Sequence, residues 1–470
     1  MNKVFLAALA LLLAGCASPV PQALPPQMLP EKFTAAAPDA PLWPVQDWWQ
    51  GFGDSELSTL IAAAQAGNRD IAIAAARVDQ AQALAGVQRS ALFPQLGLGA
   101  DGNDGGCSGQ SCRSFPGSGT LGLNVSASYA LDLWGQNRNN LRAANEQWKS
   151  ARFGGQAVAL SVTGDVARQY LSILSLRRRM AIARENIAAI EAILTVINLR
   201  VKAGAASHLD LAREEAQIES VNAQLAALQT QEKQGLNALA VLLGRPPQDF
   251  DITPQNLDGV QAPVVAAGLP SELLLRRPDI AQAEADLAAA HANLDAARAA
   301  FLPQVTLTGS GGFVSAALGT LVQGSNFGFG YGAGLLQTLF DGGRLASQKD
   351  LARAVQEEYV ATYQRTALRA FADVENALTQ VANTSRAEGH LRRTVEAARK
   401  AFEISELQYR QGAADLLSVL QAQQTLFSAE DQVAQTVLAN RQAIVHLFEA
   451  LGGGWQEMPD DRTQAGLQQG

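Results

Sequence analysis

The stretch FGFGYGAGL, residues 327–335, decides the fold because apolar side chains alternate with glycine along all of it. A period of two is typical of a β-strand, whose successive side chains point to opposite faces of a sheet. Transmembrane β-barrels show this pattern, with the apolar face towards lipid and the small or polar face towards the lumen. A soluble sheet with one buried face gives the same alternation, but it seldom lines its wet face with four glycines. We therefore predict a lipid-facing row of Phe327, Phe329 and Tyr331 and a lumen-lining row of Gly328, Gly330, Gly332 and Gly334.

Three further strands are predicted, at residues 95–100, 120–133 and 304–314, and the opening stretch belongs to a fourth at 326–340. Residues 120–133 repeat the alternation, with leucine and valine on one face and glycine, asparagine and serine on the other. Four strands cannot close a barrel, and an open edge in hydrocarbon leaves unsatisfied backbone groups that cost several kcal/mol each. Several chains must therefore join. Two chains give eight strands and three give twelve, and the strand pattern alone does not choose between them.

The chain carries one set of landmarks twice. The stretch ALFPQL at residues 91–96 returns as AFLPQV at residues 300–305, and their prolines lie 209 positions apart. Three more pairs lie 208 or 209 apart, namely Asp132 with Asp341, Gly204 with Gly412, and Gly244 with Gly452. One long offset indicates two copies of a large unit rather than a solenoid. We place the copies at residues 48–260 and 261–455, followed by a tail at 456–470.

Each copy is predicted to contain a helix, two strands, a very long helix, a turn and a long returning helix. The predicted helices are 68–92, 136–202 and 208–243 in the first copy, and 278–301, 344–410 and 413–451 in the second. The longest helix of each copy has 67 residues, which is about 100 Å at 1.5 Å per residue. Helices of this length cannot bury themselves in a globule, so they indicate packed coiled-coil geometry.

The beginning of the chain predicts export. Lys3 is followed by an apolar run and then by Leu13-Ala14-Gly15-Cys16, so residues 1–15 are typical of a secretory signal peptide. The last four residues resemble a bacterial lipobox, which implies cleavage before Cys16 and lipidation there; a chance cysteine at an ordinary cleavage site is the alternative. Ala17 follows the cysteine, which favours sorting to the outer membrane. Proline-rich residues 16–47 then form a stiff tether.

Composition excludes several classes of function. A net charge of −8 argues against nucleic acid as a partner. Cys107 and Cys112 lie in a loop rich in glycine and serine, and the oxidising compartment predicts a local disulfide between them. Two thiolates without a neighbouring histidine do not fill a zinc shell, so we expect no metal. The four histidines lie far apart, and we expect no cofactor and no catalysis. Arg177-Arg178-Arg179 is interpreted as a solvated helix face, with a partner contact as the alternative.

At this point a family resemblance becomes specific. The matching stretches are WWQGFGD at 48–54, SYALDLWG at 128–135, LAVLLGRPP at 239–247, GLPSELLLRRPDI at 268–280, LFDGGR at 339–344 and LGGGW at 451–455. Together they resemble the outer-membrane factor, or TolC-like, family, in its lipoprotein branch of multidrug efflux channels. The resemblance implies a homotrimer with a twelve-stranded barrel in the outer membrane, a twelve-helix periplasmic tunnel and a mixed α/β equatorial belt at residues 245–275. It also implies a passive duct for drugs and other small toxic compounds, together with a periplasmic adaptor protein and an inner-membrane transporter of the RND type.

The resemblance also assigns roles at the periplasmic tip, where the turns at Gly204 and Gly412 lie. Family members hold this tip shut by polar links, and the matching positions here are Asp210 and Tyr409, which we expect to share a hydrogen bond. The family's arginine two residues after the second turn is replaced by Ala414.

Several other tip positions also depart from the family pattern. Arg410 is the candidate substitute for the missing arginine. Ser418 and Gln421 stand where members place acidic residues, which puts a strong cation-binding ring in doubt. Asp415 is a candidate to supply that charge, with an N-cap role as the alternative.

Two other functions remain open. One is a structural or adhesive coiled-coil lipoprotein without a pore, against which the glycine-lined strands argue. The other is a type I protein-secretion duct of the same family. The lipobox and the ending at 451–455 favour efflux over secretion, by resemblance. We expect the protein in the bacterial outer membrane, anchored by lipid and extending into the periplasm.

Overall fold

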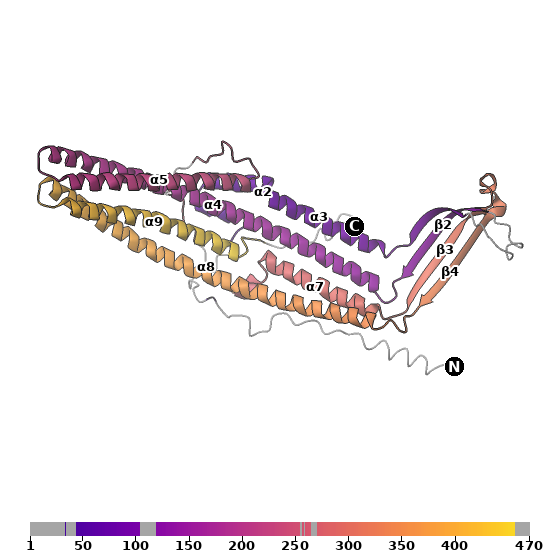
Figure 1. Cartoon of the computed structure of the whole chain (residues 1–470). Coiled ribbons are helices and arrows are strands. Elements are labelled where there is room, and N and C mark those ends of the chain that lie inside the picture. Colours follow the sequence, from indigo (N-terminus) through magenta and orange to yellow (C-terminus); the bar gives the residue numbers. More distant parts are fainter. Residues whose placement is uncertain are drawn as a thin grey trace.

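The computed structural model describes residue 33 and residues 44–103, 119–253, 256–257, 259–264 and 270–455. The described chain is elongated, with a four-stranded sheet at one end and the turns of two helical hairpins at the other (Figure 1). The predicted signal peptide with Cys16, the loop with Cys107 and Cys112, and the tail at 456–470 lie outside the described residues.

The sheet is an antiparallel meander in the order β1-β2-β3-β4. Its strands are β1 (Gln95–Asn103), β2 (Thr120–Leu131), β3 (Gln304–Ser315) and β4 (Phe327–Leu336). The strands β2 and β4 end at Leu131 and Leu336, earlier than the predicted residues 133 and 340, and after each strand an aspartate caps the start of the following helix. Asp132 accepts hydrogen bonds from the backbone N–H groups of Asn137 and Arg138, and Asp341 accepts them from Gly343 and Leu345. These carboxylates satisfy N–H groups that a helix start leaves free.

Six helices form the body of the molecule in two matched sets. The first set is α3 (Arg69–Ser90), α4 (Gln136–Lys202) and α5 (His208–Leu242), with 22, 67 and 35 residues. The second set is α7 (Pro278–Ala299), α8 (Arg344–Arg410) and α9 (Leu416–Ala450), also with 22, 67 and 35 residues. The α4 and α8 bounds agree with the prediction. Helix α9 begins at Leu416 instead of residue 413, because Asp415 is its N-cap.

Five short helical elements among the described residues were not predicted, namely η2 (Trp48–Phe52), α2 (Ser55–Gly67), α6 (Pro270–Leu273), η4 (Leu318–Thr320) and η5 (Gly324–Asn326). The first two cover the middle of the helical body and complete its largest apolar cluster. Trp48 stacks on Phe448 of α9 with ring centroids 4.8 Å apart. Asp54 caps α2 by accepting from the backbone N–H groups of Glu56 and Leu57, and Tyr170 of α4 donates its hydroxyl hydrogen to Asp54 at 2.6 Å. The N-terminal segment is thereby fixed to the long helix α4.

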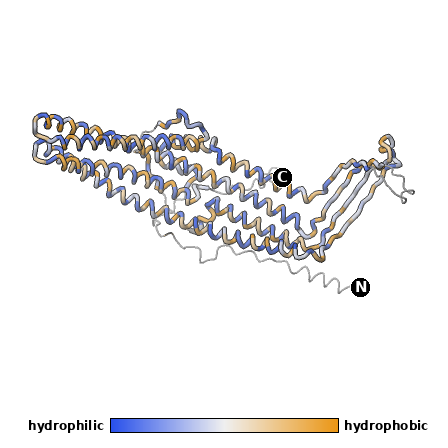
Figure 2. The backbone as a smooth tube through the Cα atoms, in the orientation of Figure 1, coloured by the Kyte–Doolittle hydropathy of each residue, from blue (hydrophilic) through white to orange (hydrophobic). Residues whose placement is uncertain are grey.

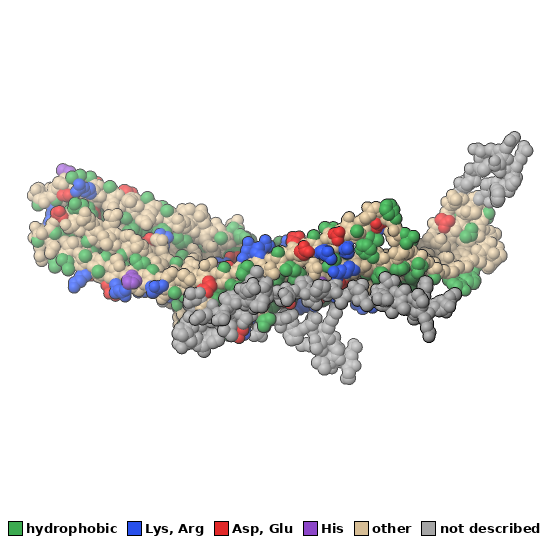
Figure 3. All heavy atoms as spheres, turned by 90° about the horizontal axis from the view of Figure 1, so that it is seen from below, with side chains coloured by type: hydrophobic (Ala, Val, Ile, Leu, Met, Phe, Trp, Pro, Cys, Tyr) green, Lys and Arg blue, Asp and Glu red, His purple; other side chains and the backbone are tan. Residues whose placement is uncertain are grey.

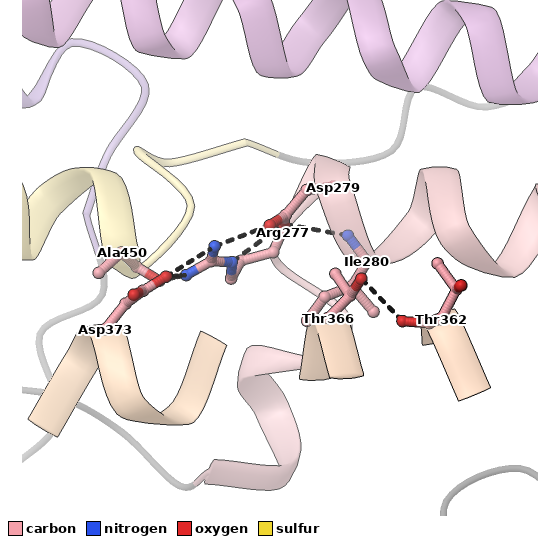
Figure 4. A network of polar contacts seen from close by, with 7 residues as sticks. All are labelled: Arg277, Asp279, Ile280, Thr362, Thr366, Asp373 and Ala450. Atoms are coloured by element: carbon pink, nitrogen blue, oxygen red, sulfur yellow. Dashed lines mark hydrogen bonds and ion pairs between the residues drawn. The ribbon is translucent and has the colours of Figure 1, made fainter. Parts of the chain in front are cut away.

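A guanidinium joins the three helices of the second set (Figure 4). Arg277, the N-cap residue of α7, donates to Asp279 at 2.7 Å, to Asp373 of α8 at 3.3 Å and to the Ala450 carbonyl of α9 at 3.1 Å. Its side chain is only 12% exposed, so these bonds compete little with water. The bonds fix the end of α9 against both α7 and α8.

The prediction of a solvated arginine run was wrong for two of its three residues. Arg177 is 8% exposed; it donates to Glu232 of α5 at 2.7 Å and to the Ile252 carbonyl at 2.7 Å. Arg179 donates to Asp431 of α9 at 2.6 Å. A buried guanidinium remains charged because carboxylates and carbonyls surround it. The run therefore ties α4 to both returning helices.

Hydrophilic and hydrophobic residues are interspersed along every helix, without a long apolar block (Figure 2). Among the described helices, none combines the length and the apolar character that crossing a membrane requires. On the face shown in Figure 3, charged side chains gather over the middle of the body and near the tip, and few lie on the sheet.

Candidate functional site: the sheet and the hairpin tip

The sheet has two chemically distinct faces that run across all four strands. One row of paired residues consists of Gly97, Ser126, Ser310 and Gly330, and the next consists of Leu98, Val125, Gly311 and Phe329. Because neighbouring positions on a strand point to opposite faces, the first row lies on one face and the second on the other. One face therefore carries mainly glycine and small or polar side chains, and the opposite face carries mainly apolar ones.

The predicted lumen-lining glycines lie on the open, small-residue face. A Cβ atom at Gly328 or Gly334 would meet nothing within 4 Å. At Gly330 and Gly332 it would meet only the hydroxyls of Ser310 and Thr308, at 3.8 and 3.4 Å. Glycine is thus not required here by crowding within the protomer, and its effect is to keep the surface smooth and wide.

The predicted lipid-facing side chains are exposed on the opposite face. Phe327, Phe329 and Tyr331 are 51%, 75% and 90% exposed. Within the described protomer β1 pairs only with β2 and β4 only with β3, so each outer strand has one unpaired edge. Such an edge is a template for pairing with another chain.

The two helical hairpins turn at the glycines that the sequence indicated. Gly204 and Gly412 have φ angles of 72° and 77°, a left-handed conformation that glycine adopts without strain. Ala205 and Ala413 donate their backbone N–H groups back to carbonyls of the preceding helix, each at 2.8 Å. Ser207 caps α5 and Asp415 caps α9. Both turns are therefore built in the same way.

The predicted partners Asp210 and Tyr409 have other partners within the protomer. Asp210 accepts hydrogen bonds from the backbone N–H of Ser207 at 3.2 Å and from its hydroxyl at 2.9 Å, which closes a capping box at the start of α5. Tyr409 is 6% exposed. Burial raises the pKa of Tyr409, and the nearby carboxylate of Asp210 raises it further. The hydrogen bond between these two residues is not formed within the described protomer; between protomers it stays a prediction.

Arg200 is the tip residue that the sequence reasoning missed. Its guanidinium lies 4.4 Å from the centre of the Tyr409 ring and donates to the carbonyls of Tyr409 at 2.7 Å and Arg410 at 3.1 Å. These carbonyls end α8, so a cation of α4 neutralises the negative end of the helix dipole of α8. Arg200 joins the first hairpin to the second. A basic residue in the last turn of a helix usually interacts with the carbonyls that end the same helix. No sequence signal shows that Arg200 contacts the other hairpin instead.

The remaining tip residues lie on the surface. The Arg410 guanidinium pairs with Glu406 of its own helix at 2.5 Å, and the Arg410 carbonyl accepts a hydrogen bond from Arg200 of the first hairpin. Asp415 accepts hydrogen bonds from the backbone N–H of Ser418 at 2.9 Å and from its hydroxyl at 2.5 Å, and these bonds lower the pKa of Asp415. The N-cap alternative for Asp415 is thus what the structure shows. Ser418 and Gln421 are exposed.

The described part of the chain offers no metal site, because no three histidine, cysteine, aspartate or glutamate side chains come together in it. The candidate site is therefore a surface with two parts: a sheet with unlike faces and open edges, and a tip where two hairpins are joined by Arg200. Such an arrangement can line and close a passage.

Comparison with known proteins gives a consistent result. The family model described as "Outer membrane efflux protein" matches residues 60–245 and 269–453. The pyoverdine export outer membrane protein OpmQ of Pseudomonas aeruginosa is 39% identical over 88% of this chain and 88% of its own. The toluene efflux pump outer membrane protein TtgC of Pseudomonas putida is 31% identical over 98% and 97%. Among solved structures, the outer-membrane channel OprN has a TM-score of 0.86 at 27% identity and covers 94% of this chain and 100% of its own.

Proposed function

The chain belongs to the outer membrane efflux protein family, and from this premise we propose how it forms and controls an export path. As a family member it is the outer-membrane channel of a tripartite efflux pump, and it is not an enzyme. Its fold is that of the trimeric channels that it resembles, with a β-barrel and a long helical tunnel. The proposals below concern the lumen, the anchor, the tip and the cargo.

The first proposal is that the small-residue face of the sheet lines the lumen and the aromatic face contacts lipid. Three copies bring twelve strands, and pairing β4 of one copy with β1 of the next would satisfy the edges that the single chain leaves open. A chain that did not pair with other copies would leave the backbone groups of these edges unpaired in hydrocarbon, at a cost of several kcal/mol for each group. The two unlike faces of the sheet are the observation that carries this proposal.

The second proposal is that the chain is anchored through lipid at Cys16 and extends into the periplasm. Phe33, 17 residues further on, is 3% exposed and belongs to a buried cluster with Leu273, Ile280 and Phe371. The burial of Phe33 against α7 and α8 supports an attachment of the N-terminal segment to the helical body at this residue. In the periplasm the channel would meet a periplasmic adaptor protein and, through the assembled pump, an inner-membrane transporter of the RND type.

The third proposal is that the hairpin tip is the gate. Within a protomer Arg200 holds the two hairpins together, and between protomers a bond from Tyr409 to Asp210 would add a second link. Tyr409→Phe tests that second link cleanly, because it removes one hydroxyl and leaves the capping box of Asp210 intact. We expect higher conductance in this variant; unchanged conductance would show that the inter-protomer bond does not form.

The cargo is proposed to be drugs and other small toxic compounds, as relatives named for toluene and antibiotic efflux suggest. A second candidate is a pyoverdine-like secreted molecule, since relatives from two Pseudomonas species named for pyoverdine export are 39% and 37% identical. Export assays in a host that lacks its own channel distinguish the two candidates. Restored drug tolerance supports the first, and restored secretion of pyoverdine supports the second.

One experiment tests the channel itself. Purified trimers in planar lipid bilayers should conduct ions, and conductance should fall when a bulky side chain such as tryptophan replaces Gly332 on the small-residue face. Tyr331→Trp, on the opposite face of the same strand, is the matched control and should leave conductance unchanged. A structural lipoprotein would give no conductance in the bilayer. A secretion duct would be distinguished in cells, where it would release protein into the medium.

A further inference from the structure

Helix α5 contacts α4 through a seam with the spacing of a coiled coil. Its positions are Leu211, Glu214, Ile218, Val221, Leu225 and Leu228, which alternate steps of three and four residues. Coiled-coil seams of this spacing are built from apolar side chains. Val221 and Leu228 are 2% and 3% exposed, and Glu214 is 0% exposed. An acidic residue therefore occupies a core position in the second turn of α5, close to the hairpin tip.

Within the described residues, no hydrogen bond offsets the free-energy cost of burying the carboxyl group of Glu214. Neither of its oxygens has a hydrogen-bond partner among the described residues. Ionised carboxylates in such surroundings are costly, and the group takes up a proton instead. Burial alone raises the pKa of Glu214 from 4.5 to about 7. The side chain therefore changes charge near neutral pH.

The groups around Glu214 do not supply a counter-charge. On α8, Tyr409 is close enough for the carboxylate of Glu214 to raise its pKa. On α4, Arg200 directs its guanidinium to the carbonyls that end α8. On α5 itself, Asp210 is acidic and lies one turn nearer the tip, and α9 contributes the apolar Leu416 to the cluster around Tyr409. Ionised Glu214 would therefore face another acid and no free cation from these elements.

We propose that Glu214 is a protonation switch that controls the packing of the periplasmic tip. As a neutral acid it fits the α4–α5 seam and holds the hairpin closed. When it loses its proton to water, the buried charge drives α5 away from the seam and the tip opens. The inference rests on the proposed function, because it assigns a control to the gate of a channel.

The direction of the effect follows from proton binding. The packed tip holds the proton more tightly than an open tip, in which Glu214 would meet water and titrate near its ordinary pKa. Stabilisation of the packed tip is therefore complete at acid pH, falls as pH rises from about 4 and is lost above the folded pKa of about 7. Between pH 6 and pH 8 the ratio of open to packed tips should rise about tenfold per protomer.

Two readouts on the intact trimer test the switch. Planar-bilayer conductance reports opening. Amide hydrogen exchange in the first turns of α5, expressed as protection relative to the intrinsic exchange rate at each pH, reports packing whether or not the channel conducts. In the wild type, conductance and exchange should each report the tenfold rise in the ratio of open to packed tips between pH 6 and pH 8. Glu214→Gln, which keeps the shape and removes the charge, should remain packed at both values. Glu215→Gln removes the same charge from the exposed neighbour and should behave as wild type.

The results that overturn the switch are specific. It is wrong if the protection of the wild-type amides in α5, corrected for the intrinsic exchange rate, is the same at pH 6 and pH 8, or if Glu214→Gln keeps the pH step in that protection. It is equally wrong if Glu215→Gln abolishes the step. Glu214→Leu, which completes the apolar seam, provides a second pH-independent variant should glutamine disturb folding. Absence of conductance at every pH in every variant would count against the channel instead, and the exchange data would still decide the switch.

Discussion

Replacing Arg200 by alanine should loosen the gate, because this guanidinium links α4 of the first hairpin to the end of α8 of the second hairpin at the tip. It makes two charge-assisted hydrogen bonds, at 2.7 and 3.1 Å, to the carbonyls that end α8. Hydrogen bonds to charged groups contribute about 1.5–3 kcal/mol each when buried, and a cation over an aromatic ring adds about 0.5–1 kcal/mol at exposed sites. Because Arg200 is half-buried, water replaces part of this energy, and we take about 2 kcal/mol for the whole link.

A loss of about 2 kcal/mol corresponds to about a thirtyfold rise in the ratio of open to closed tips per protomer. Planar-bilayer recordings of purified trimers should show this rise as higher mean conductance. Lys202→Ala is the matched control, since it removes the same charge from an exposed position in the same last turn of α4. Arg200→Lys should recover part of the effect, because an ammonium reaches the carbonyls without the planar fork. Equal conductance in wild type, Arg200→Ala and Lys202→Ala would refute the link.

Three further outcomes are expected. Gly332→Cys should react with a membrane-impermeant thiol reagent in intact trimers and lose conductance, whereas Tyr331→Cys in lipid should not; equal reactivity would contradict the assignment of the two faces. Cys16→Ser should prevent acylation, so mass spectrometry of the mature protein should show no attached lipid, while any lipid found on the variant would exclude this anchor. Phe52→Ala opens a cavity at a fully buried position and should cost about 3–5 kcal/mol, measured as a lower urea midpoint of the solubilised trimer; an unchanged midpoint would contradict its role in the core.

Periodicity and helix-ending glycines made most of the fold predictable. The 67-residue helices were bounded correctly because Gly204 and Gly412 end them through backbone conformations that favour glycine. The strand ends were less accurate, because the apolar pattern continues beyond the last paired residues, to Leu133 after β2 and to Phe340 after β4, and such a pattern does not show where pairing stops. Helix α2 was missed although the sequence carries its signal: Asp54 is suited to an N-cap, and the buried residues Leu57, Leu60, Ile61 and Ala64 follow at helical spacing.

The candidate site was only partly predictable, and the reason is geometric. Local signals showed where the turns lie and that a residue such as Asp415 is suited to an N-cap. The contacts of Arg200 depend instead on how two hairpins separated by about 200 residues approach each other, and no spacing in the sequence encodes this approach. Glu214 was passed over for the opposite reason, because an acidic residue on a polar-looking helix suggests solvent until the seam is known.

The two copies differ in charge at the tip, and this difference bears on how a gate built from them works. Moving 208 positions along the chain replaces Arg200 by Gln408, Asp210 by Ser418 and Glu214 by Ala422, while the turn glycines and the helix lengths are kept. Duplication therefore preserved the scaffold of the hairpins and left these three ionisable groups to the first. In a trimer, hairpins of the first kind would alternate with hairpins that lack these charges, so every contact around the tip joins unlike neighbours. A change of protonation or of a single bond in the first hairpin would then act at three equivalent places at once, which is how a small local energy can move the whole tip.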